Sequence, residues 1–255
     1  MSTIKSILNK THIHPSCYFL LLLSVFSANF FIVILIISLL FIHELGHFIT
    51  AHILGFETIS ITFYPFGGVS KFFHDLNCPI KHELLVLLMG PIFQTLFYLF
   101  LTTLNCISSY LDILKSIHYS ILFFNLLPIY PLDGGRIFQC LSCYFISYNA
   151  SFKFIYLLSS FFIILFLIIF YLNPTLNLLL IIILLIIKLC KEHKNIKYYF
   201  ERFILERYLH RYNFKKSTIV TKVEDFKRDY CHLIKVNNKY FEEQEFLNLK
   251  YKKML

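Results

Sequence analysis

The chain alternates long apolar runs with short polar connections, a pattern typical of integral membrane proteins. The clearest run extends from Phe30 to Phe41 and contains no charged side chain. The apolar runs predict spans over Cys17–Ser27, Phe30–Leu54, Glu83–Leu104, Ser116–Ala150, Phe152–Leu172 and Leu176–Ile187. The first of these is short, because a full crossing takes about 20 residues. The fold class that the pattern predicts is an α-helical integral membrane protein with about six transmembrane helices.

Three ionisable side chains interrupt the second apolar run. His43, Glu44 and His47 lie inside this run, shortly after its uncharged stretch ends at Phe41. A charged group at membrane depth costs from a few to ~10 kcal/mol, so its presence there indicates function. On a helix His43 and His47 share one face, because residues four apart differ by about 40° in azimuth. Two neutral imidazoles in that position can bind one Zn²⁺, and Glu44 can serve as the general base of a hydrolysis.

Residues 55–81 do not follow the helical pattern. Thr58 to Phe63 alternates polar and apolar residues, which is the period of a strand. Pro65 and Gly67-Gly68 supply a turn, and residues 69–72 are expected to return as a second strand. This membrane-associated β-hairpin is either an ordinary surface hairpin or one whose edge accepts an extended peptide.

The fourth apolar run has an irregular centre. Residues 125–136 read Asn-Leu-Leu-Pro-Ile-Tyr-Pro-Leu-Asp-Gly-Gly-Arg, and irregular backbone at membrane depth is tolerated where it lines a cavity buried in protein. The second and fourth spans run in the same direction, and His43 and Asp133 lie roughly 20 and 26 Å along them. Asp133 is therefore the candidate third metal ligand. The alternative is an Asp that caps a helix at the Gly-Gly break.

Other polar residues near the apolar runs are weaker candidates for ligands. His52 lies half a turn out of phase with the first histidine, and Glu57 and Glu83 lie at or beyond the membrane edge. Arg136 is expected to reach the interface or to pair with a carboxylate. Asn125 has two interpretations, a hydrogen-bond donor to an oxyanion or an amide that packs helices together.

Charge is concentrated at the C-terminal end of the 255-residue chain. Residues 188–255 contain 17 Lys+Arg against 9 Asp+Glu and so carry +8 of the net charge of +9. Interleaved acids and the preceding apolar runs favour a face next to anionic lipid over a nucleic-acid site. The basic connections place both termini on the cytoplasmic side. The seven cysteines are an odd number scattered along the chain and indicate no disulfide framework.

The chain beyond Lys188 is soluble in character. It predicts a helix over Tyr198–Tyr212, a second over Val220–Tyr230, a strand over His232–Val236, a turn at Asn237-Asn238 and a last helix over Phe241–Leu249. We therefore expect a transmembrane domain over residues 1–190, a linker helix over 191–217 and a small cytoplasmic α/β domain over 218–255.

The polar segments at residues 43–47 and 125–136 together resemble the site-2 protease family of intramembrane zinc metalloproteases. Gly67-Gly68 and Gly90-Pro91 are similar to two further features of that family, and Gln94 stands where the family more often has Asn. The resemblance covers roughly residues 12 to 150. It implies one Zn²⁺ per chain, with these roles: His43, His47 and Asp133 as ligands, Glu44 as the base, and Asn125 assisting catalysis.

Within the family, the chain resembles the sporulation proteases that process a membrane-associated sigma-factor precursor, pro-sigma-K. The shared features are six spans, no inserted PDZ domain and a small C-terminal domain. The tail from about Thr218 is similar to part of a CBS domain, a nucleotide-sensing module, although a full CBS unit is longer. The partners implied are a membrane-tethered protein substrate, the lipid bilayer, inhibitory membrane proteins and a second copy of the chain, without nucleic acid.

Three alternatives to this interpretation stay open from the sequence. A protease of the same type could act on other membrane substrates. A metal-binding membrane transporter could use His and Asp in a helical bundle, but it would not need Glu44 beside His43. An inactive regulator would lack the base or a ligand, and here the four polar groups are all present.

Overall fold

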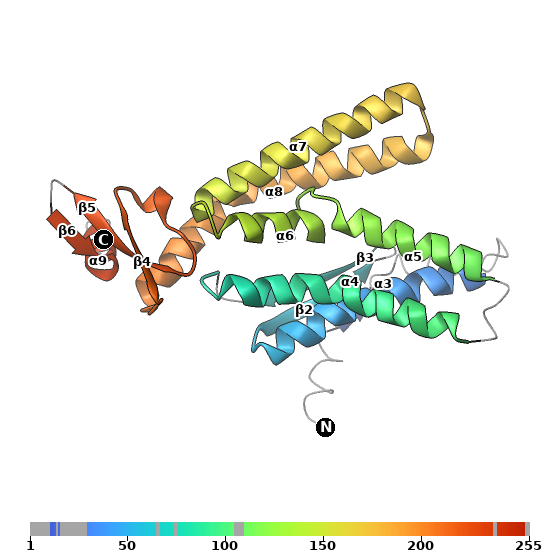
Figure 1. Cartoon of the computed structure of the whole chain (residues 1–255), viewed down its shortest axis with the longest axis horizontal. Helices are drawn as coiled ribbons and strands as arrows, with labels where there is room; N and C mark the ends of the chain where they lie inside the picture. Colours follow the sequence, from blue (N-terminus) through green and yellow to red (C-terminus); the bar gives the residue numbers. More distant parts are fainter. Residues whose placement is uncertain are drawn as a thin grey trace. The chain divides into compact units, whose positions relative to one another are not determined.

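The computed structural model describes residues 11–13, 15, 30–64, 67–73, 76–104, 110–236 and 239–252. These residues are mostly helical and include two three-stranded sheets (Figure 1). The chain divides into two compact units, which we describe separately. The first unit comprises residues 1–74 and 85–125, and the second comprises residues 75–84 and 126–255. The predicted span at Cys17–Ser27 lies outside the described residues.

Three helices form the body of the first unit: α3 (Phe30–Ile53), most of α4 (Ile80–Thr102) and α5 (Leu111–Leu126). A buried cluster of four leucines joins them: Leu35, Leu39, Leu101 and Leu114. Gly46 of α3 packs against the backbone of α4, because a Cβ atom at Gly46 would lie 2.9 Å from the carbonyl carbon of Met89. Small residues of this kind allow membrane helices to approach closely.

The sheet of the first unit confirms the predicted hairpin. β2 (Glu57–Tyr64) and β3 (Gly67–Phe73) are antiparallel, with Ile61 opposite Ser70 and a bulge between Thr58 and Ser60. The structure adds β1 (Thr11–Ile13), which pairs in parallel with β2. The order β1-β2-β3 therefore leaves β3 at an edge of the sheet among the described residues. Both β2 and β3 contact α3.

The second unit contains α6 (Asp133–Ser142), α7 (Tyr148–Leu172) and α8 (Leu176–Leu209). α6 and α8 both pack on α7. Beyond α8 lies a C-terminal module with strand order β4-β5-β6 and a final helix. Its elements are β4 (Lys216–Val220), the 3₁₀ turn η2 (Val223–Asp225), β5 (Tyr230–Val236), β6 (Lys239–Glu242) and α9 (Glu243–Lys252). β4 is parallel to β5, and β6 is antiparallel to it.

Two predictions for the second unit differ from the structure. The sequence predicted a span over residues 176–187 and a separate helix from Tyr198, whereas α8 is continuous because residues 176–209 contain no Gly or Pro to end it. The helix predicted over Val220–Tyr230 is wrong. That segment forms a single 3₁₀ turn and then reaches β5 through Asp229, whose φ of 58° is incompatible with a right-handed helix.

Three described helices are long and apolar enough to cross a membrane by length and composition: α3, α4 and α7. The fourth predicted span is divided into α5 and α6 by an irregular segment at residues 127–132. The largely apolar part of α8, residues 176–187, ends before Lys188 and extends about 18 Å, less than the ~30 Å of a bilayer core. The count of six spans and the three domain limits remain predictions.

Candidate metal centre

The two histidines of α3 face each other inside the first unit. His43 and His47 are 2% and 7% exposed, and their Nε2 atoms lie 3.1 Å apart. The shared helix face that the sequence predicted is confirmed. His52 is exposed and stacks on Phe48, at 6.3 Å between ring centroids, so it lies on another face of α3, as its spacing predicted.

Each of these imidazoles has its other nitrogen committed to a carbonyl-type oxygen on α4. Nδ1 of His43 lies 3.0 Å from Oε1 of Gln94, and Nδ1 of His47 lies 2.8 Å from the backbone oxygen of Val86. An amide or backbone oxygen only accepts hydrogen bonds, so each Nδ1 carries the ring proton. Both Nε2 atoms are therefore the lone-pair nitrogens.

Two lone-pair nitrogens that face each other can both bind one cation placed between them. Zn–N bonds of about 2.0–2.1 Å at a tetrahedral angle place two ligand nitrogens about 3.3 Å apart, close to the 3.1 Å found between His43 and His47. A hydrogen bond from Nδ1 to an oxygen is also the usual outer arrangement of metal-bound histidine. The imidazole pair therefore fits a zinc ion.

The orientation of Gln94 is fixed by a third histidine. Nε2 of Gln94 donates to the backbone oxygen of His118 at 3.1 Å, so the amide oxygen must point toward His43. Gln94 and His118 are 0% and 1% exposed, and the ring of Tyr98 stacks on that of His118 with 4.2 Å between centroids. This chain of contacts runs from α5 through α4 to the metal-facing side of α3.

Asp133 belongs to the second unit, where it is the first residue of α6. The N-cap of α6 is Leu132, which makes no side-chain capping bond. Asp133 is therefore not the N-cap, contrary to the alternative left open by the sequence. A carboxylate in the first turn of a helix is stabilised as the anion, which is the form that a metal ligand needs.

The irregular segment before α6 folds back over the first turn of that helix. A Cβ atom on Gly134 would meet the backbone oxygens of Leu126 and Leu127, and one on Gly135 would lie 2.5 Å from backbone atoms of Ile129 and Tyr130. The two consecutive glycines are thus required by close backbone contact. Among the described residues, His43, His47 and Asp133 provide a set of donor atoms that could hold a metal ion.

Comparison with known proteins finds similarity to peptidases. Residues 30–109 match peptidase family M50. The chain is 31% identical over 133 residues to stage IV sporulation protein FB of Bacillus subtilis, which covers 50% of this chain and 46% of that protein. It is 30% identical over 128 residues to a zinc metalloprotease of Methanocaldococcus jannaschii, which covers 46% of this chain and 35% of that protein. The chain thus spans less than half the length of these relatives.

The fold is also similar to a solved structure, the site-2 protease from Methanocaldococcus jannaschii. The TM-score is 0.55 at 23% identity, and the match covers 71% of this chain and 89% of that one. The chain resembles the site-2 proteases of peptidase family M50.

The remaining candidate residues of this M50-like chain have defined places. Asn125 is half-buried near the end of α5. Arg136 lies 3.6 Å from Glu83, which confirms the predicted pairing with a carboxylate. Glu83 also bonds to Arg228 at 2.6 Å, so this carboxylate belongs to an ion-pair network of the second unit. Glu44 is half-buried on α3, next to His43.

Sequence reasoning assigned no role to Gln94, His118 or Val86, the residues that orient the imidazoles. Gln94 had a usable signal, since it is an amide inside the apolar run of α4 and polar groups at membrane depth indicate function. Val86 had none, because it contributes through its backbone oxygen.

Proposed function

We propose that this protein is an intramembrane zinc metalloendopeptidase of the site-2 type, which hydrolyses a peptide bond of a membrane-tethered protein near the cytoplasmic face. The observation that carries the proposal is the pair of facing Nε2 atoms on α3, 3.1 Å apart, with Glu44 next to the first of them. The match of residues 30–109 to peptidase family M50 supports it, as do relatives named as zinc metalloproteases.

In this proposal His43, His47 and Asp133 hold one zinc ion through two imidazole nitrogens and a carboxylate. Bound zinc supplies Lewis-acid chemistry, polarising the scissile carbonyl and making water a better nucleophile near neutral pH. Gln94 and Val86 keep both imidazoles in the tautomer that presents Nε2.

Glu44 is the general base. Its carboxylate takes a proton from the water that attacks the carbonyl carbon and passes it to the departing amide nitrogen as the C–N bond breaks. Asn125 donates a hydrogen bond to the oxyanion of the tetrahedral intermediate. The products are a new carboxyl terminus and a new amine terminus, and no redox partner is required.

The edge strand β3 supports a mode of substrate binding. A helical transmembrane substrate has its peptide groups already hydrogen-bonded, so it must be extended before it is cleaved. An extended segment could pair with the edge strand β3 of the sheet beside α3, as the described strands are ordered. We place both termini in the cytoplasm, because Lys and Arg are concentrated in the tail and in the connections on that side.

A sigma-factor precursor is the substrate we propose first, on the similarity to stage IV sporulation protein FB. Inhibitory membrane proteins and a second copy of the chain are the partners we propose with it. Other tethered proteins are the alternative substrates. Co-expression of the chain with a panel of tethered substrates, including a pro-sigma factor, would distinguish these by the appearance of a cleaved product.

The deciding variant is Glu44→Gln, which keeps size and hydrogen bonding but takes up no proton. We expect its zinc content to equal that of the parent and its cleavage rate to fall by about 10²–10⁴-fold. Glu57→Gln is a control outside the ligand set. A transporter would tolerate Glu44→Gln, and an inactive regulator would show no cleavage in the parent. Parental cleavage by the Gln variant would contradict the hydrolytic mechanism.

A further inference from the structure

The segment that leads into α4 is held by the C-terminal module. Arg228, 2% exposed, lies in the connection between β4 and β5. Its Nη1 donates to Oε2 of Glu83 at 2.6 Å, and its Nη2 donates to the backbone oxygen of Cys78 at 2.9 Å. The backbone N–H of Ile80 donates to Oδ2 of Asp229 at 3.3 Å. Two neighbouring residues of the module thus contact the first turn of α4.

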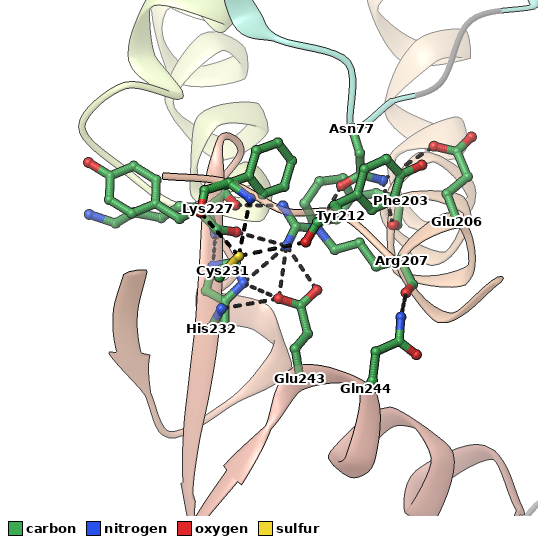
Figure 2. Close-up of polar contacts among 12 residues, drawn as sticks. Asn77, Phe203, Glu206, Arg207, Tyr212, Lys227, Cys231, His232, Glu243 and Gln244 are labelled. Atoms are coloured by element: carbon green, nitrogen blue, oxygen red, sulfur yellow. Dashed lines mark hydrogen bonds and ion pairs between the residues drawn. The ribbon is translucent and has the colours of Figure 1, made fainter. Parts of the chain in front are cut away.

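A second buried arginine contacts the same segment at Asn77, just before α4 begins. Arg207, at the end of α8, donates from Nε to Oδ1 of Asn77 at 2.6 Å, and Nδ2 of Asn77 donates to the backbone oxygen of Phe203 at 3.1 Å. Figure 2 shows the guanidinium between Asn77 and Glu243, with which it forms an ion pair at 2.9 Å. The donors of Arg207 are shared between Asn77 and the module, so one side chain links the two.

The carboxylate of Glu83 joins the module to α6 as well. While its Oε2 accepts from Arg228, its Oε1 lies 3.6 Å from Nη2 of Arg136. Arg136 is three residues after Asp133 on α6 and therefore one turn away on the same helix. Glu83 is 12% exposed in its side chain and Arg228 2%, so removing either leaves a buried charge without its main partner.

Glu83 belongs to α4 and contacts α6 through Arg136. Both helices carry atoms of the candidate metal centre. Val86, whose backbone oxygen accepts from Nδ1 of His47, is three residues after Glu83 on α4. Asp133 begins α6. We propose that Arg228 is a positioning residue for the metal site, which holds Glu83 and thereby fixes the start of α4 and, through Arg136, the first turn of α6.

This inference rests on the proposed zinc site and makes the module a part of that site's support. The folded state of the module sets how firmly Glu83 is held, and through it the placement of the Val86 carbonyl and of Asp133. A ligand or partner that moves the segment around Arg228 would therefore change metal affinity and cleavage together.

The test uses the whole 255-residue chain in detergent. Zinc dissociation constants are measured by competition with a chelator, and the visible spectrum of the Co²⁺-substituted protein is a second readout. Arg228→Gln is expected to weaken zinc binding up to about tenfold, the low end of the effect of losing a direct partner of a metal ligand, because Arg228 acts through Glu83, and to shift the cobalt spectrum. Arg211→Gln is the matched control, because Arg211 is exposed and pairs with Glu242 at 3.6 Å.

Glu83→Gln and the double variant complete a mutant cycle. Because both singles remove the same link, the double variant should bind zinc no more weakly than the weaker single. Amide hydrogen exchange of β5 reports whether the module stays folded in each variant. Arg228→Lys, which keeps a cation beside Glu83 but loses the geometry that also reaches the Cys78 oxygen, should fall between parent and Gln variant.

The proposal is overturned if Arg228→Gln binds zinc as tightly as Arg211→Gln, or if affinity falls only in variants whose β5 amides have lost protection. Independent, additive losses in the mutant cycle would overturn it too. A parent chain that binds no zinc would refute the proposed function itself, and this inference with it. If the parent binds zinc and Arg228→Gln binds it equally tightly, only this inference is refuted.

Discussion

Gly90 of α4 lies directly against the imidazole of His47 on α3. A Cβ atom at position 90 would lie 2.8 Å from Cδ2 of that ring and closer still to Nε2 and Cε1. The helix therefore carries a glycine here because the proposed ligand occupies the space that a side chain would need.

Gly90→Ala should displace His47 and weaken zinc binding by tenfold or more, measured by chelator competition. Helix propensity alone would instead predict that Gly90→Ala stabilises the protein, because alanine favours a helix by about 1 kcal/mol over glycine. A variant that is more stable and binds zinc like the parent would show that the contact with the imidazole does not matter.

Asp133→Ala should abolish stoichiometric zinc binding, because two imidazoles alone leave a zinc site one protein ligand short. Metal analysis of the purified protein measures this directly. Asp112→Ala is the matched control, since Asp112 is an exposed carboxylate in the first turn of α5. Full retention of zinc by the Asp133 variant would remove this residue from the ligand set.

Gln94→Leu should weaken zinc binding about 10–100-fold, because Nδ1 of His43 loses its acceptor and the imidazole can take the wrong tautomer. Gln94→Glu keeps an acceptor oxygen for Nδ1 of His43 but loses the donor to the His118 oxygen, so it should lose less zinc affinity than Gln94→Leu. Gln139→Leu tests for general damage, since Gln139 is also buried but bonds to Ser151 in the second unit. Equal losses in the Leu and Glu variants would contradict the tautomer argument.

The C-terminal module should lose stability in acid through His232. The backbone N–H of Lys227 donates to Nε2 of His232 at 2.9 Å, so the neutral ring carries its proton on Nδ1, 2.9 Å from Glu243. Burial lowers the pKa of His232 below its usual 6.5, and Arg207 adds to this, although Glu243 opposes it. Burial by itself would raise the pKa of Glu243, but His232 and Arg207 lower it below 4.5.

Both groups bind fewer protons in the folded module than in the unfolded chain. The stability of the module should therefore be constant above pH 6.5, fall as the pH drops below that value, and fall further below pH 4.5. Hydrogen exchange of β5 amides, corrected for the intrinsic pH dependence, measures it. Replacement of the exposed His210 by Ala should leave the curve unchanged, whereas a flat profile through pH 6.5 in the parent would contradict the assignment of His232.

Much of the metal centre followed from the sequence because helix geometry is local. The spacing of His43 and His47 determines that both imidazoles lie on one face of α3, whatever surrounds the helix. The hairpin of β2 and β3 was predictable for the same reason, since alternation and a Gly-Gly turn act over few residues. The apolar runs of α3, α4 and α7 indicated membrane helices through length and composition alone.

Local signals also produced the errors. The change from apolar to charged residues after Lys188 suggested that a helix ends there, but composition does not break a helix and α8 continues to Leu209. In the module, the positive φ of Asp229 and the pairing of β4 with β5 depend on partners distant in the chain, so the helix predicted over Val220–Tyr230 did not form.

By itself, then, the sequence determined which residues can bind a metal and that two of them share a helix face. The tertiary structure decided how they are held. The acceptors for His43 and His47 come from another helix, at Gln94 and Val86, and Glu83 meets Arg228 from 145 residues further along the chain. No periodicity encodes such contacts, because they arise when packed elements bury polar groups that must then find partners in each other.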